Sequence, residues 1–193
     1  MTPTEQLLRT RPMRADARRN YESVIASARE AFAVGGAATS LEEIARNAGV
    51  GIGTLYRHFP NRQALLEAVY VDEVEALCSS AAEFADLPPW EAFVAWMRRF
   101  VSYMQTKQAL AAELLDYVDR DSALFKSCRA SLFAASAPLL DRAQSAHVVR
   151  PDTNLDEIIQ MVGGIAKIPA DPAQVEHILQ IALDGLRYQA SVG

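Results

Sequence analysis

Apolar residues recur every three to four positions along most of this chain, which is the spacing of the buried face of an amphipathic helix. Tyr21, Val24, Ala28 and Phe32 share one such face, and the glycine pair 35–36 ends it. No stretch alternates apolar and polar residues as a half-buried strand would. The pattern predicts an all-α protein of about nine helices, at about residues 17–33, 41–48, 52–59, 62–84, 89–106, 109–118, 121–146, 154–167 and 170–188.

Residues 40–62 predict two short helices joined by a tight turn. Ser40 and Glu43 have the S-x-x-E spacing of a capping box, which opens the first helix. Gly49 ends that helix, as glycine does at the position after a C-cap. Ile52, Leu55 and Phe59 share one inward stripe of the second helix, and the next residue, a proline, ends it. The pattern is that of a helix-turn-helix.

The outward face of the second short helix is suited to a groove lined by phosphates. It carries Gly53, Thr54, Tyr56 and Arg57, with His58 at its margin, and it has no carboxylate. Helix pairs of this kind also occur in all-α proteins that do not bind DNA. The glycines at 49–53 resemble a phosphate-binding loop, but such a loop follows a buried strand, whereas a capped helix precedes these glycines. DNA binding is therefore the favoured interpretation.

Charge is distributed unevenly along the chain. The net charge is −5, but residues 1–62 carry +3 and residues 63–193 carry −8. A polyanion is attracted to the first part and repelled by the second. Five arginines between residues 9 and 19 are either a solvated terminus or an arm that neutralises phosphates. There is no secretory signal, no apolar run that spans a bilayer and only two cysteines, so we expect a cytoplasmic protein with reduced thiols and no membrane partner.

The run from residue 17 to about residue 77 resembles the DNA-binding region of the tetracycline-repressor (TetR) family. The residues that carry the resemblance are 28–32, Ser40–Ala45, Ala48–Val50, Gly53–Phe59 and Arg62–Leu66. The remainder resembles, more loosely, the helical ligand and dimerisation domain of these regulators. The resemblance implies an arm at 1–16, a helix-turn-helix domain at 17–62 and an effector-binding and dimerisation domain at 63–193. It also implies a homodimer through the last two helices, about 155–167 and 172–188, whose apolar residues occupy more than one face.

For the predicted DNA interface, each residue has an expected role. Thr54 and Arg57 are candidates to read base edges, and Gly51 and Gly53 bring the main chain close to the DNA. The expected phosphate contacts are Ser40, Tyr56, His58 and Arg62.

Aromatic residues gather between residues 90 and 133, where they either fill an ordinary core or line an apolar effector site. Its predicted lining residues are Trp96, Phe100, Tyr103, Tyr117 and Phe125. The three histidines are scattered and no nucleophile motif occurs, so we expect no catalytic residue, no metal and no cofactor. The predicted function is a ligand-responsive repressor that binds a pseudo-palindromic operator as a dimer. The alternative is a helical small-molecule-binding protein that does not bind an operator.

Overall fold

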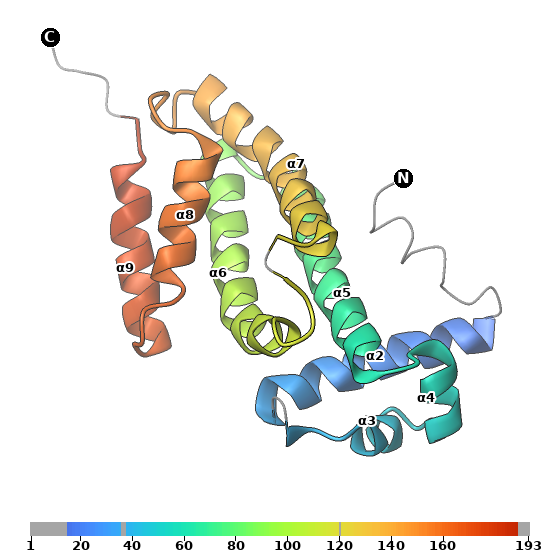
Figure 1. The fold of residues 1–193 in the computed structure, drawn as a ribbon. Helices are drawn as coiled ribbons and strands as arrows, with labels where there is room; N and C mark the ends of the chain where they lie inside the picture. The colour runs from blue at the N-terminus through green and yellow to red at the C-terminus, as the bar shows by residue number, and fades with distance from the viewer. Residues whose placement is uncertain (1–14, 36–37, 120, 189–193) are drawn as a thin grey trace, which may run out of the picture. The chain divides into compact units, whose positions relative to one another are not determined.

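The computed structural model describes residues 15–35, 38–119 and 121–188, and the regular structure in these ranges is helical (Figure 1). This confirms the predicted all-α class. The eight helices in this part of the chain are α2 (Ala15–Gly35), α3 (Leu41–Asn47), α4 (Ile52–His58), α5 (Arg62–Glu83), α6 (Pro89–Leu114), α7 (Ala123–Ser145), α8 (Leu155–Ile165) and α9 (Pro172–Gly185).

The prediction of separate helices at 89–106 and 109–118 is wrong, because α6 runs without a break from Pro89 to Leu114. The sequence T-K-Q-A at 106–109 contains no glycine or proline that would end a helix, and all but the threonine are good helix formers. After Leu114 the chain turns, with the amides of Tyr117 and Val118 donating to the Leu114 carbonyl at 3.0 Å. The fused helix explains why eight helices are described where nine were expected.

The chain forms two compact units. Of the described residues, the first unit contains those up to Val74 together with those between Thr106 and Arg129, and the second contains Glu75–Gln105 and those from Ala130 onward. The first unit packs α2, α3 and α4 together (Figure 1). Its core is built from one apolar face of each helix, including Val24, Ala28, Phe32, Ile44, Leu55, Phe59, Leu65 and Leu66, all at most 2% exposed. These positions follow the helical spacing in the sequence.

The second unit contains α8 and α9, which lie side by side, and the first part of α6 (Figure 1). Asn154 caps α8 in a complete capping box with Glu157, and Asp171 caps α9 just before Pro172. From α6, Arg98 donates to Glu176 of α9 at 2.7 Å and to Gln180 at 2.9 Å. These bonds fasten α9 to α6.

Two contacts hold the segment that follows α9: an isolated β-bridge and a cation–π pair. Val149 and Arg187 form an antiparallel bridge, and the Arg187 guanidinium lies 4.2 Å from the centroid of the Trp90 ring.

Among the described residues, no helix is long and apolar enough to cross a membrane, and no three His, Cys, Asp or Glu side chains are grouped as metal ligands are.

Candidate nucleic-acid interface

The turn between α3 and α4 has the geometry that the sequence predicts. Ser40 is the N-cap of α3, and its hydroxyl accepts from the Glu43 amide at 3.1 Å, which is one of the two bonds of the predicted capping box. At the other end of α3, Gly49 has φ +69°, a left-handed conformation that side chains with a Cβ rarely adopt. The amide of Val50 then bonds the Ala45 carbonyl at 3.0 Å. A glycine at 49 is therefore needed to turn the chain from α3 into α4.

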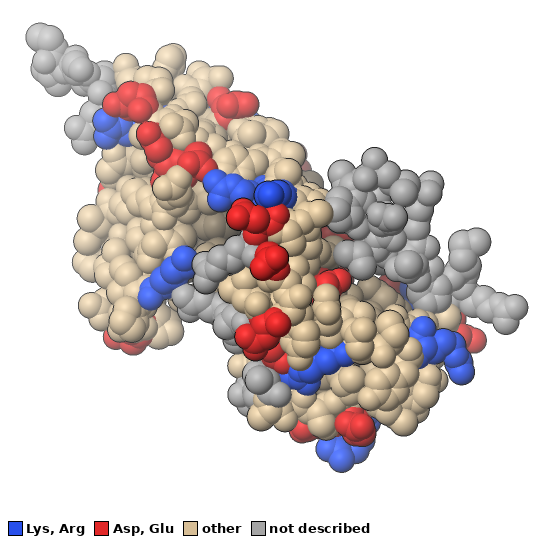
Figure 2. Space-filling view, in the orientation of Figure 1, with Lys and Arg blue, Asp and Glu red and all other residues tan. Residues whose placement is uncertain are grey.

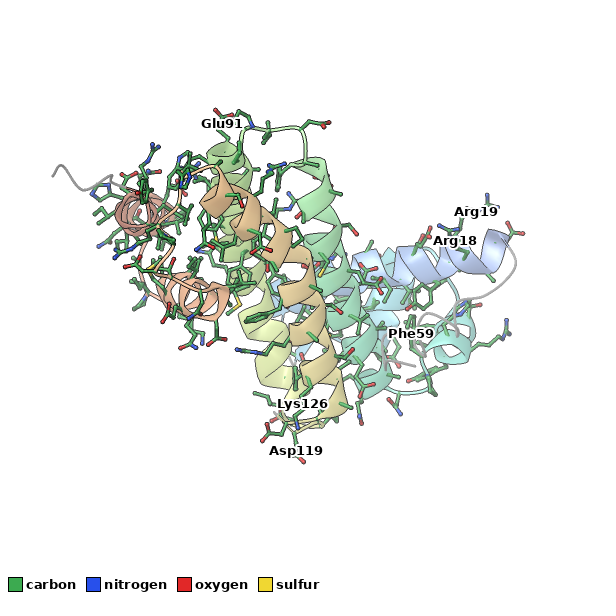
Figure 3. The ribbon with its side chains drawn as sticks, turned by 90° about the horizontal axis from the view of Figure 1, so that it is seen from above. Arg18, Arg19, Phe59, Glu91, Asp119 and Lys126 are labelled. Carbon is green, nitrogen blue, oxygen red and sulfur yellow. The ribbon has the colours of Figure 1, made fainter. Side chains whose placement is uncertain are left out.

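Helix α4 is anchored by its inner face. Leu55 is fully buried and Phe59 nearly so, as predicted. Phe59 packs on Tyr21 of α2 with ring centroids 5.1 Å apart, and its position is labelled in Figure 3. The prediction that Ile52 belongs to the same buried stripe is wrong, because Ile52 is 38% exposed. Ile52 is the first residue of α4, and the buried stripe begins one turn later.

The outer face of α4 carries no carboxylate, and it has no side chain at its two glycines. Gly51 and Gly53 are exposed, and a Cβ built at either position would meet nothing within 4 Å. Tyr56 is 44% exposed, Arg57 is exposed and Thr54 is half-buried. Neither glycine has a packing reason inside the described part of the chain. The sequence-predicted surface residues of α4 therefore lie together on one accessible side.

His58 lies at the edge of this face, half-buried against α2. Its ring meets Tyr21 edge-on, with centroids 6.1 Å apart. Burial, with the nearby Arg57 guanidinium, holds the pKa of His58 below its ordinary value of 6.5. The imidazole is therefore mainly neutral at neutral pH, and a nearby anion would favour its protonated form.

Arg62, a predicted phosphate contact, has an ion-pair partner inside the first unit. Its Nε donates to Glu113 Oε1 at 2.6 Å, and its guanidinium also donates to the Thr39 carbonyl. The guanidinium lies 5.0 Å from the centroid of the Phe32 ring. Arg62 therefore joins α2, the segment before α3, the start of α5 and the end of α6. Its acidic partner is 51 residues away, so no local pattern in the sequence indicated this role.

Two of the five clustered arginines, Arg18 and Arg19, lie on the first turns of α2. Arg18 pairs with Glu22 at 2.8 Å and Arg19 pairs with Asp16, and all four side chains are exposed. Figure 3 shows Arg18 and Arg19 projecting from the start of α2. Arg9, Arg11 and Arg14 lie outside the described residues.

The five predicted effector residues fall in two different units. Trp96 and Phe100 stack with centroids 5.7 Å apart in the second unit, and Phe100 contacts Tyr103 at 6.2 Å. All three are buried. In the first unit, Tyr117 is exposed, and Phe125 packs edge-on against Tyr70 at 5.1 Å. Within the second unit, the three residues of α6 lie together.

The buried aromatic cluster of α6 (Trp96, Phe100 and Tyr103) has two further features. A Cβ built at Gly163 of α8 would lie 3.9 Å from Phe100 Cε1, so α8 approaches this cluster closely. The Trp96 indole N–H is buried and has no hydrogen-bond partner among the described residues. A buried donor without an acceptor is costly to the fold and marks this position as unusual.

Comparison with known proteins identifies both parts of the chain. The family model "Bacterial regulatory proteins, tetR family" matches residues 24–69, and "Transcriptional regulator SbtR-like, C-terminal domain" matches residues 88–188. The crystal structure of the TetR transcriptional regulator SCO0520 from Streptomyces coelicolor is 40% identical, covers 88% of this chain and 99% of its own, and has a TM-score of 0.78.

The chain belongs to the TetR family of transcriptional regulators. A TetR transcription regulatory protein from Mycobacterium vanbaalenii is also similar, with 35% identity over 91% of this chain and 99% of its own and a TM-score of 0.77. Salmonella enterica GusR, at 18% identity and a TM-score of 0.63, shares the fold. This TetR-family protein is therefore a DNA-binding transcriptional regulator and not an enzyme.

Proposed function

We propose that this TetR-family regulator is a repressor that binds a pseudo-palindromic operator as a homodimer and is released by a small apolar or amphipathic effector. The observation that carries the DNA-binding part is the outer face of α4, which is exposed, without carboxylates and low at Gly51 and Gly53. Such a face can approach the floor of a major groove. As a regulator of transcription, the protein would act in the cytoplasm, where the chromosome lies.

The proposed contacts follow from the positions of the side chains. Thr54 and Arg57 would reach base edges, with Arg57 able to pair bidentately with guanine. Ser40, Tyr56 and His58 would contact phosphates and fix the register without reading the sequence. We do not retain Arg62 as a phosphate contact, because its guanidinium already bonds Glu113 and Thr39.

The experiment that tests this function is selection of bound sequences from random duplexes by the full-length protein, followed by affinity measurements at several salt concentrations. A repressor of this kind selects a site with two-fold symmetry, and its affinity falls steeply as salt is raised. The alternative, a helical small-molecule-binding protein without operator binding, predicts no enriched sequence. A weak interaction with every duplex at low salt only would also contradict the proposal.

Protonation of His58 is expected to make DNA binding depend on pH. A phosphate beside the imidazole favours the cation that burial disfavours, so binding takes up a proton and affinity rises as pH falls from about 7.5 to 5.5. Each unit by which DNA raises this pKa is worth up to about tenfold in affinity per subunit.

The stability of the free protein depends on pH in the opposite direction. Because the folded-state pKa is lowered, the folded protein binds fewer protons, and its stability falls as pH drops below 6.5.

The measurement is the dissociation constant of the selected operator at constant ionic strength across this pH range, for the wild type and for His58→Gln. The variant keeps a hydrogen-bonding side chain but loses the titrating group, so its affinity should vary much less with pH. An equal pH dependence in both proteins would assign the effect to another group.

The proposed dimer is supported by the outward side of α9. Ile181 is 60% exposed, and Ile178 lies beside it on the same face, half-buried. A Cβ built at Gly185 of α9 or at Gly164 of α8 would meet nothing within 4 Å, so another helix could approach closely at these positions. In Figure 2 the left edge of the molecule, where α9 lies, carries few Lys, Arg, Asp or Glu side chains. A second copy of the pair α8–α9 would cover this face in a two-fold four-helix interface.

Placing a charge on this face should separate the subunits. We expect Ile181→Glu to be monomeric in sedimentation experiments at concentrations where the wild type is dimeric, because burying an unpaired carboxylate is costly. Since Ile181 is exposed within one chain, the helix content should be unchanged. The control is Ala134→Glu, which adds the same charge to an exposed position of α7. Equal dimerisation of both variants would place the interface elsewhere.

The effector site is proposed at the buried aromatic cluster of α6, and its support is the unpaired Trp96 indole N–H beside two further aromatic rings. An effector that binds better to a non-DNA-binding state would release the operator, and its influence is limited to that difference in affinity. Tryptophan fluorescence measured while aromatic compounds are titrated, in the wild type and in Trp96→Phe, tests this part. A compound that releases the operator without changing the Trp96 signal would exclude this location.

A further inference from the structure

One apolar side chain of the candidate interface has no role in the assignments above. Ile52 is the first residue of α4 and is 38% exposed, whereas the apolar residue one turn later, Leu55, is fully buried. A single exposed apolar side chain is common and carries no meaning by itself. The position of Ile52 is what distinguishes it.

Ile52 carries the only side chain at the start of α4, because the N-cap residue before it and the residue after it are both glycines. Gly51 precedes it, Gly53 follows it, and a Cβ at either glycine would meet nothing within 4 Å. Tyr56, four residues later on the same side of the helix, is also exposed. Ile52 therefore stands between two low points of the surface that the proposed function directs at DNA.

Local helix stability does not account for an isoleucine here. A β-branched residue has a lower helix propensity than alanine or leucine, and the exposed part of its side chain gains nothing from burial within the chain. Contact with another surface would remove that apolar area from water. The N-terminal residues of a recognition helix are those that reach base edges in helix-turn-helix proteins.

The major groove offers one apolar feature to such a side chain, which is the C5-methyl group of thymine. Cytosine at the same place presents an amine and no methyl group. We propose that Ile52 contacts the methyl group of a thymine in each operator half-site and so makes that base pair a determinant of specificity. This inference rests on the proposed function, because it requires α4 to enter the major groove.

Replacing thymine by deoxyuridine tests the proposal, because it removes the methyl group and leaves base pairing intact. Each thymine of the selected operator is replaced in turn, symmetrically in both half-sites, and dissociation constants are measured at fixed salt. For the wild type we expect one position at which the replacement weakens binding by about fourfold per half-site, the value of one buried methyl-sized group, or roughly 15-fold when both half-sites are replaced.

The same duplexes are then measured with Ile52→Ala and Ile52→Val. At the sensitive position, Ile52→Ala should bind the thymine and deoxyuridine duplexes equally, whereas Ile52→Val should keep most of the wild-type preference. Thymines elsewhere in the operator serve as the control, since their replacement should affect all three proteins alike. Thermal unfolding of each variant shows whether the fold is retained, which is expected for an exposed position.

The outcomes separate this inference from the proposed function. If the wild type binds a symmetric operator but the effects of Ile52→Ala and deoxyuridine are additive at every position, DNA binding stands and the role of Ile52 is overturned. The same holds if the selected half-site contains no thymine. If no sequence is enriched at all, the proposed function fails first and this inference fails with it.

Discussion

Replacing Arg62 with alanine is expected to lower the free energy of unfolding by about 3 kcal/mol, the lower end of the range for removing one partner of a buried ion pair. The Arg62 side chain is 20% exposed and that of Glu113 only 6%. Without Arg62 the Glu113 carboxylate stays buried with no counterion, and its Oε2 already has no hydrogen-bond partner among the described residues. The Thr39 carbonyl would also lose a donor.

Chemical denaturation followed by circular dichroism measures this loss. Arg19→Ala is the matched control, because Arg19 pairs with Asp16 on the surface, where such pairs contribute little. Glu113→Gln should cost less than Arg62→Ala, since the amide keeps a hydrogen-bond acceptor and removes the buried charge. If Arg62→Ala were no more destabilising than the control, the inward position of this side chain would be wrong.

Replacing Gly53 with leucine is expected to weaken operator binding on the order of 100-fold while leaving the protein folded. The new side chain meets nothing within the chain, so it projects from the face proposed to enter the groove. It would hold Thr54 and Arg57 away from base edges in both subunits of the proposed dimer, and each base contact is worth about 1–3 kcal/mol. Binding of the selected operator at fixed salt measures the effect.

Two further glycine variants distinguish an effect on DNA binding from an effect on the stability of the protein. Gly53→Ala should stabilise the protein by about 0.5–1 kcal/mol, because alanine favours a helix interior, and should weaken DNA binding less than leucine does. Gly49→Ala should instead destabilise the protein, since φ at this position is +69°. If Gly53→Leu bound the operator as tightly as the wild type, α4 would not approach the DNA by this face.

The short helices of the DNA-binding region could be predicted from the sequence because local signals define them. Ser40 caps α3, Gly49 ends it, and Leu55 and Phe59 have helical spacing. The same spacing placed Ile52 wrongly in the core. Periodicity gives the direction of a side chain around the helix but not the point along the helix at which the packed layer begins.

Features that depend on distant parts of the chain could not be predicted. Nothing near Arg62 in sequence points to Glu113, so the sequence alone favours a DNA contact for an arginine beside a helix-turn-helix. Among the predicted effector residues, Trp96 and Phe100 share one helix and do meet, because their spacing is a local property. Tyr117 follows the turn after Leu114 and belongs to the other unit, so its place in the predicted effector site stays a prediction.

The absence of side chains at Gly51 and Gly53 has a consequence for how this regulator would be retargeted. Under the proposed docking, the start of α4 offers only three chemically distinct probes to the bases: the side chains of Ile52, Thr54 and Arg57. Because so few side chains would contact the bases, one or two substitutions could change the DNA sequence that is recognised. Variants at these three positions should therefore yield regulators with new and mutually independent target sites.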